Sequence, residues 1–176
     1  MLESQHIFDG LPHKIGAVKL EVVDLPKITL IAPFKGQMMA VADVLKADIG
    51  MVLPPAGQCG ESVKAKAYWR TPGQWLVLGT LDAGKLAGMA AVADMSDAFA
   101  RLRLSGGADV LARLVEVDVE TMQAGQVAHT MLADIPVTLI MGKEGMGIMV
   151  PRSYAGSVVA RLAVAMRSVA ARGLVG

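Results

Sequence analysis

The sequence predicts an α+β fold in which helices pack on one face of a mainly antiparallel sheet. Short alternating or β-branched runs, bounded by glycine and proline, indicate strands. An apolar stripe at helical spacing near the C-terminus indicates a long helix. The same order of elements occurs twice along the chain, which suggests duplicated β-α-β-β-α units. We therefore expect an N-terminal arm over residues 1–16, which show no clear period, followed by one domain over residues 17–176.

The first half contains a predicted strand pair joined by a tight turn. The run Arg70-Thr71-Pro72-Gly73 separates two apolar or alternating stretches and is typical of a hairpin. A helix is predicted from the spacing of Met38, Val41, Ala42 and Leu45, with Gly50 ending it. The other elements expected here are strands at 17–23, 28–31 and 91–95, the hairpin strands at 62–69 and 74–79, and a helix over 81–90.

The second half begins with strict alternation from Ala100 to Leu104, which places Arg101 and Arg103 on the face away from the core. Ser105-Gly106-Gly107 then predicts a turn before a short helix. Pro151 marks the start of the last helix. The remaining expected strands are 127–132, 137–141 and 146–150, and the apolar stripe of the last helix contains Val158, Val159, Leu162, Ala163, Met166 and Val169.

The composition is apolar for a chain without a membrane span. Hydrophobic residues make up 53% and charged residues 19%, with 12 methionines, and the mean hydropathy is +0.48. The longest apolar run, Ile135 to Met141, is too short to cross a bilayer. We expect no span and no signal peptide. A surface buried against a protein partner is favoured, because methionine adapts to irregular contacts; a core rich in Ala, Val and Met is the alternative.

Charge and cysteine usage exclude several classes of protein. The net charge is +1 and no long basic run occurs, so the electrostatic footprint of a nucleic-acid-binding protein is missing. Cys59 is the single cysteine, which precludes an internal disulfide. A cytoplasmic location fits this usage.

Groups that could perform chemistry are few and scattered. Cys59 has no base or helix N-terminus nearby in the sequence, so a reactive thiol is not supported. A triad of Ser153, His129 and Asp134 would lack the Gly-x-Ser-x-Gly turn that exposes a nucleophile. With His6 and His13 in the arm, the histidines show no metal-ligand spacing. We predict no catalytic, cofactor-binding or metal-binding residue in this chain.

The glycine-rich run Gly142-Lys143-Glu144-Gly145-Met146-Gly147 is better explained as a hairpin turn than as a phosphate loop. It matches neither the Walker A nor the dinucleotide-binding pattern. No helix follows at once, so the N-terminal dipole that would hold a phosphate is missing. The sequence supports no flavin or nicotinamide site.

A partner-contact surface is predicted from exposed-apolar reasoning. Trp69 and Trp75 flank one turn in a chain with only 4% aromatic residues. Core burial is favoured for them because tryptophan is usually buried, and interface anchoring is the alternative. The predicted surface combines the N-terminal arm, this hairpin and the turn from Met141 to Met149. Its candidate residues are Trp69, Arg70, Trp75, Met141, Met146 and Met149.

Several motifs resemble those of the gamma subunit of heterotetrameric sarcosine oxidase. The run from Ala67 to Leu78 resembles the hairpin of that family. The other matching segments, in the family's order, are Asp94-Met95-Ser96-Asp97, Arg103-Leu104-Ser105-Gly106, Gly125 to Ala133, and Val150-Pro151-Arg152-Ser153-Tyr154-Ala155. Each is weak alone, and together they extend from about Val52 to Met166. The same middle segment resembles the folate-binding domain of glycine-cleavage aminomethyltransferases, which are longer.

The resemblance implies a cofactor-free structural subunit with alpha, beta and delta partners. The family's FAD, FMN, NAD, tetrahydrofolate and zinc would belong to those partners. The complex oxidises the N-methyl group of sarcosine to give glycine, hydrogen peroxide, and formaldehyde or methylene-tetrahydrofolate. Related complexes act on N-methylglutamate or betaines. The alternative is a stand-alone folate-dependent one-carbon protein, with Asp94, Asp97 or Asp134 as the carboxylate that recognises the pterin.

Overall fold

The computed structural model describes residue 8 and residues 10–173 and has an α+β architecture. The described residues form two compact units, each with its own antiparallel sheet. Unit 1 comprises residues 1–24, 98–124 and 128–176, and unit 2 comprises residues 25–97 and 125–127. The α+β class with antiparallel pairing is confirmed. The described residues of the predicted domain over 17–176 belong to these two units, and two sheets are found where the sequence predicted one.

The sheet of unit 1 has the strand order β1-β2-β8-β11-β10-β9. Its strands are β1 (His13–Ile15), β2 (Val18–Val22), β8 (Phe99–Ser105), β9 (Val127–Leu132), β10 (Ile135–Gly142) and β11 (Gly145–Pro151). β2 pairs with β8, although residues 25–97 separate them in the chain. β1 lies inside the predicted arm, whereas residues 1–7 and 9 fall outside the described residues.

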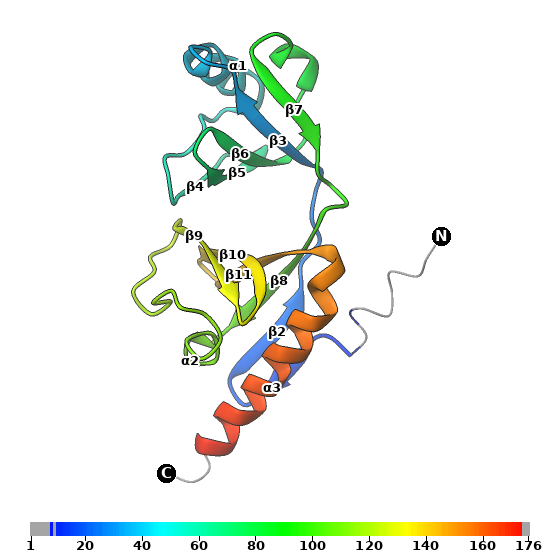
Figure 1. Ribbon diagram of the computed structural model, residues 1–176, viewed down its shortest axis with the longest axis vertical. Coiled ribbons are helices and arrows are strands. Elements are labelled where there is room, and N and C mark those ends of the chain that lie inside the picture. Colours follow the sequence, from blue (N-terminus) through cyan, green and yellow to red (C-terminus); the bar gives the residue numbers. More distant parts are fainter. Residues whose placement is uncertain (1–7, 9, 174–176) are drawn as a thin grey trace, which may run out of the picture. The chain divides into compact units, whose positions relative to one another are not determined.

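The core of unit 1 lies between this sheet and the C-terminal helix α3 (Ala155–Gly173), which follows a 3-10 helix η3 (Arg152–Tyr154) (Figure 1). The predicted stripe is confirmed, because Val158, Leu162 and Met166 are buried in this core. Leu102 and Leu104 of β8 face the same core, while Arg101 and Arg103 are half-buried on the other face, as the alternation predicted. The short helix α2 (Ala108–Leu111) completes the unit.

The sheet of unit 2 has the strand order β4-β5-β6-β3-β7. Its strands are β3 (Ile28–Pro33), β4 (Cys59–Glu61), β5 (Ala65–Thr71), β6 (Gln74–Gly79) and β7 (Ala90–Asp94). Helix α1 (Met38–Ile49) packs Val41, Leu45 and Ile49 into the core of the unit (Figure 1). Gly50 ends it in the left-handed conformation, with φ of 71°. Met38, predicted as part of the buried stripe, is 42% exposed.

One predicted helix is wrong. The segment 81–90 forms only a short 3-10 helix, η2 (Ala83–Leu86), before β7 begins. Asp82 caps it by accepting from the Gly84 amide. Gly88 then adopts a φ of 76°, which ends any helical continuation. Two glycines within five residues lower the helix propensity enough for the turn to win.

Candidate functional site

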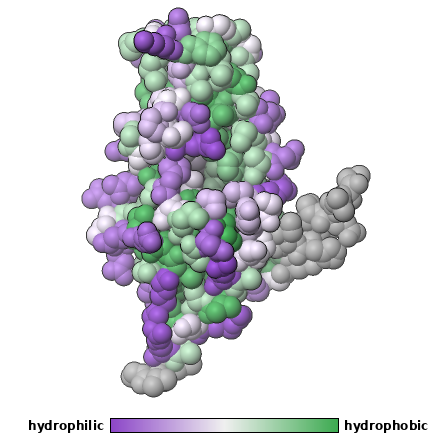
Figure 2. Space-filling view, viewed as in Figure 1, coloured by the Kyte–Doolittle hydropathy of each residue, from purple (hydrophilic) through white to green (hydrophobic). Residues whose placement is uncertain are grey.

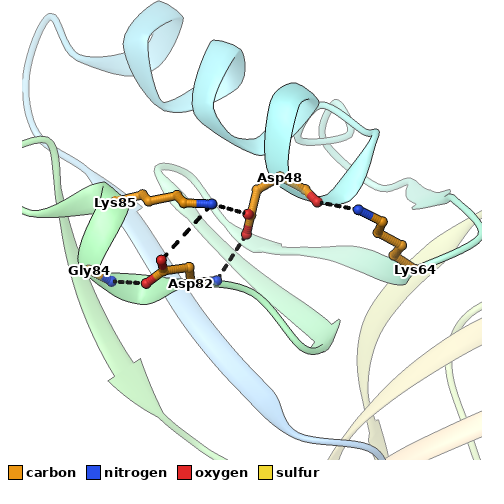
Figure 3. A network of polar contacts seen from close by, with 5 residues as sticks. All are labelled: Asp48, Lys64, Asp82, Gly84 and Lys85. Carbon is orange, nitrogen blue, oxygen red and sulfur yellow. Dashed lines mark hydrogen bonds and ion pairs between the residues drawn. The ribbon is translucent and has the colours of Figure 1, made fainter.

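A cluster of polar contacts surrounds Asp48 at the end of α1 (Figure 3). Oδ2 of Asp48 accepts a hydrogen bond from the Asp82 amide at 2.9 Å, and Oδ1 pairs with the Lys85 ammonium. Lys85 lies also within 4.0 Å of the Asp82 carboxylate. The Asp48 carbonyl accepts from Nζ of Lys64 at 2.9 Å. The cluster thus joins α1, η2 and the loop before β5.

Electrostatics in this cluster favour the charged form of each partner. The Asp82 amide, followed by Lys85, holds the pKa of the Asp48 carboxyl below its ordinary value. The hydrogen bond to Asp48 raises the pKa of the Lys85 ammonium. The cluster also covers the helix end, because Ser62 Oγ donates to the Ile49 carbonyl at 2.7 Å while Lys64 brings a positive charge to the C-terminus. These contacts hold α1 in place, and we interpret the cluster as structural.

The Asp94-Met95-Ser96 motif also makes a structural contact. Oδ1 of Asp94 accepts from both the amide and the hydroxyl of Ser96, at 2.9 and 2.6 Å. The hydroxyl, followed by the amide, lowers the pKa of the Asp94 carboxyl. Ser96 Oγ in turn accepts from the Ile28 amide at 3.1 Å. The motif therefore closes the β7 end of the sheet onto β3.

The Arg103-Leu104-Ser105-Gly106 motif fastens β8 to its neighbours. The Arg103 guanidinium pairs with the carboxylates of Glu21 and Glu144, from β2 and from the turn after β10. Lys19, followed by Arg103, lowers the pKa of Glu21. Ser105 Oγ donates to the Glu144 carbonyl at 2.8 Å. The run from Gly142 to Gly145 forms the predicted hairpin turn between β10 and β11.

His129, Asp134 and Ser153, which the sequence did not support as a triad, lie in a strand, a turn and a 3-10 helix. His129 is exposed on β9, and its Nδ1 lies 2.9 Å from Thr138 Oγ1. Asp134 pairs with Arg161 of α3 at 2.6 Å, and Ser153 is exposed in η3. Cys59 is half-buried in β4, opposite Tyr68. Within residues 8 and 10–173, no group of three His, Cys, Asp or Glu could hold a metal ion; His6 lies outside them.

The predicted contact surface is corrected at three positions, because Trp75, Met146 and Met149 are buried at 7%, 5% and 1% exposure. The Trp75 indole Nε1 donates to the Pro54 carbonyl at 2.7 Å, which identifies a core tryptophan with a satisfied polar group. Buried side chains offer no area to a partner. Trp69, Arg70 and Met141 are half-buried, and a partner contact through these three side chains stays a prediction.

Other exposed apolar side chains were not predicted from the sequence. Phe34, Met38 and Met39 are 48%, 42% and 75% exposed at the entry of α1. The helical spacing of Met38 with Val41 and Leu45 predicted that Met38 is buried. The packing of α1 in the structure leaves it exposed. On the face seen in Figure 2, hydrophobic and hydrophilic residues are intermixed. None of the described helices is long and apolar enough to cross a membrane.

The fold of this chain is similar to the folds of two proteins of known structure. One chain of the heterotetrameric sarcosine oxidase from Corynebacterium sp. U-96, solved with pyrrole 2-carboxylate, superimposes with a TM-score of 0.78. The match covers 94% of this chain and 93% of that chain, at 23% sequence identity. What the two chains share is the fold. No protein-family model and no curated protein sequence matches this chain.

A second known structure resembles this chain, and the match covers a smaller share of that second protein. The glycine cleavage system aminomethyltransferase T from Bartonella henselae gives a TM-score of 0.61 at 12% identity. The match covers 89% of this chain and 48% of the aminomethyltransferase. The chain therefore spans about half the length of that enzyme. Both matches agree with the expected folate-binding-domain-like fold.

Proposed function

We propose that this chain is a gamma-type subunit of a sarcosine oxidase-type amine oxidoreductase, acting with alpha, beta and delta partners in the cytoplasm. The complex would oxidise the N-methyl group of sarcosine to glycine, with hydrogen peroxide and formaldehyde or methylene-tetrahydrofolate as the other products. The observation that carries the proposal is the end-to-end likeness to one chain of a sarcosine oxidase heterotetramer, which leaves almost no part of either chain unmatched.

The share of this chain in the reaction would be structural, with FAD, FMN, NAD, tetrahydrofolate and zinc in its partners. The contacts of its candidate groups support this division. Asp94 is engaged by Ser96, Asp134 by Arg161, and Asp48 by Lys85 and the Asp82 amide. These three carboxylates thus stabilise a turn, a turn-to-helix contact and a helix end, respectively.

The order of elements supports an origin by duplication, which we include in the proposal. From β3 to β7 the chain runs strand, helix, three strands, 3-10 helix, strand. From β8 to α3 it runs strand, helix, three strands, 3-10 helix, then the long helix. A repeated unit would explain why two antiparallel sheets of similar plan occur in one chain.

The test is purification of an affinity-tagged copy from the native host. We expect three further chains to co-purify in equal amounts, a flavin absorption spectrum in the eluate, and hydrogen peroxide release on addition of sarcosine. N-methylglutamate and betaine, assayed in parallel, distinguish the related complexes. A colourless monomer without amine oxidation contradicts the proposal.

The second candidate is a folate-dependent one-carbon protein, favoured by the likeness to the aminomethyltransferase. Asp97, which is exposed, is the carboxylate in the predicted set for which no hydrogen bond or ion pair is seen among the described residues. Titration calorimetry of the isolated chain with tetrahydrofolate decides between the candidates. Saturable binding that Asp97→Asn abolishes would favour this function over the structural one.

A further inference from the structure

Two half-buried arginines of unit 1, Arg101 and Arg152, have no carboxylate partner among the residues that the structure describes. Nε of Arg101 and Nε of Arg152 are fully buried and have no hydrogen-bond acceptor there. Both side chains are half-buried. An N–H group that is buried without an acceptor costs free energy, because its hydration is lost and nothing replaces it. Binding of an acceptor at Nε of Arg101 and at Nε of Arg152 would therefore lower the free energy.

The position of Arg101 follows from the ladder around it. Arg101 lies opposite Met149 in the β8–β11 pair, and the Arg101 carbonyl accepts a hydrogen bond from the Val23 amide at 2.9 Å. Neither neighbour carries a carboxylate. Nε and Nη2 of Arg101 lie 3.5 Å from the point where a Cβ on Gly147 would stand, so the guanidinium rests against β11 where that strand has no side chain. Glycine allows this close approach.

Arg103 provides the contrast, since it is two residues further along the same face of β8. Its guanidinium pairs with Glu21 and Glu144. The chain thus supplies carboxylates to one arginine of the pair and leaves the other without one. Arg161 of α3 likewise has its own carboxylate, from Asp134. The lack of an anion at Arg101 is a local property and does not extend to all arginines of the unit.

Arg152 belongs to the same end of the β8–β11 pair. It follows β11 directly, and its amide donates to the Ala98 carbonyl, just before β8, at 3.0 Å. Pro151 pairs with Phe99 at this end, and Arg101 lies two residues further along β8. One end of the sheet therefore carries two half-buried cations without an anion among the described residues.

We propose that Arg101 and Arg152 receive carboxylates of acidic side chains on another subunit, so that this end of the β8–β11 pair is a partner interface. The inference rests on the proposed function, which makes the chain part of an assembly. Guanidinium groups match carboxylates in a bidentate geometry, and arginine is enriched at protein interfaces. The partner surface is acidic at this point.

Arg101→Met, which keeps length and apolar contact but removes the charge, tests the interface in the reconstituted complex. We expect the affinity for the partner subunits to fall roughly 30-fold or more, because a partner carboxylate would lose its cation. The isolated variant should unfold at a urea concentration no lower than the wild-type chain, because no internal ion pair is lost. Arg167→Met, at an exposed position of α3, is the control and should bind as the wild type does.

Arg101→Lys gives a readout that a merely structural role would not produce. A carbodiimide links a lysine amine to a carboxylate in direct contact, so mass spectrometry should find position 101 joined to an aspartate or glutamate of another subunit. A link to a carboxylate of the same chain overturns the proposal. Stabilisation of the isolated wild-type chain by glutarate, lost in Arg101→Met, would assign the arginine to a small ligand and also overturn it.

The arginine interface and the proposed function are refuted by different results. If the wild-type chain assembles and Arg101→Met binds with unchanged affinity, the arginine interface is wrong and the proposed function stands. If the wild-type chain forms no assembly with any other subunit, both are wrong.

Discussion

Asp48 illustrates how single residues fix the elements of this chain. Its carboxylate faces an amide and an ammonium, so the folded state holds the pKa of the carboxyl below its ordinary value. A group with a lowered folded-state pKa stabilises the protein at pH values above its unfolded pKa, about 4 for aspartate. That stabilisation is lost as the pH falls through the folded-state pKa.

Asp48→Asn should therefore lower the urea midpoint at pH 7, and the difference from the wild type should shrink as the pH approaches 3. Urea unfolding followed by circular dichroism at both pH values measures this. Asp43→Asn, at an exposed position of the same helix, is the matched control and should leave the midpoint within error at both. A deficit of Asp48→Asn that is equal at pH 7 and pH 3 would contradict the electrostatic account.

Two turn glycines separate conformational strain from lack of space. Gly145 has a φ of 132°, and a Cβ there would stand 2.5 Å from the Leu104 carbonyl oxygen. Gly73 has a φ of 77° with nothing within 4 Å. Gly73→Ala should cost about 1 kcal/mol for the left-handed backbone alone, and Gly145→Ala about 3 kcal/mol because β8 must move away. Equal free energies of unfolding for the two variants would show that the close approach of the Leu104 carbonyl to position 145 adds no cost.

At the scale of elements, strand alternation and the helical stripes were predictable where one face is buried and the other is not. Strand β8 has one buried face, and so do the helices α1 and α3, whose buried stripes begin at Val41 and Val158. β6 is different, because Trp75, Leu76, Val77 and Leu78 are all buried. A run that is apolar at every position does not say which face carries the core. The burial of Trp75 therefore follows from the general tendency of tryptophan to be buried and not from the pattern of the strand.

Helix α3 carries a large share of the core of unit 1, which gives a direct test of its predicted stripe. Leu162 is fully buried there, whereas Val164 is 59% exposed. Leu162→Ala should lower the free energy of unfolding by about 2–5 kcal/mol through the cavity it leaves. Val164→Ala should change it by less than about 0.5 kcal/mol. Thermal unfolding of the two variants measures both losses of stability. A larger loss for Val164→Ala than for Leu162→Ala would contradict the assignment of the buried face of α3.

At the scale of the molecule, the sequence could predict the α+β class but not the division into two units. The chain leaves unit 1 after Asp24 and returns at Ala98, so β2 and β8 pair across the whole of the intervening segment. Periodicity is a local property and carries no information on such pairings. The same limit explains the candidate site, since the contact of Asp48 with Lys85 and the lack of a carboxylate near Arg101 depend on elements distant in sequence.

We propose that this chain is bound by partner subunits and carries no cofactor of its own. Native mass spectrometry of the tagged chain, purified from its host under mild conditions, tests it most directly. The account predicts one copy of this chain in an assembly with three different subunits. It also predicts that dissociation releases the chain at the mass of its polypeptide, 18.4 kDa plus the tag. A lone chain whose mass includes a bound flavin or folate would contradict it.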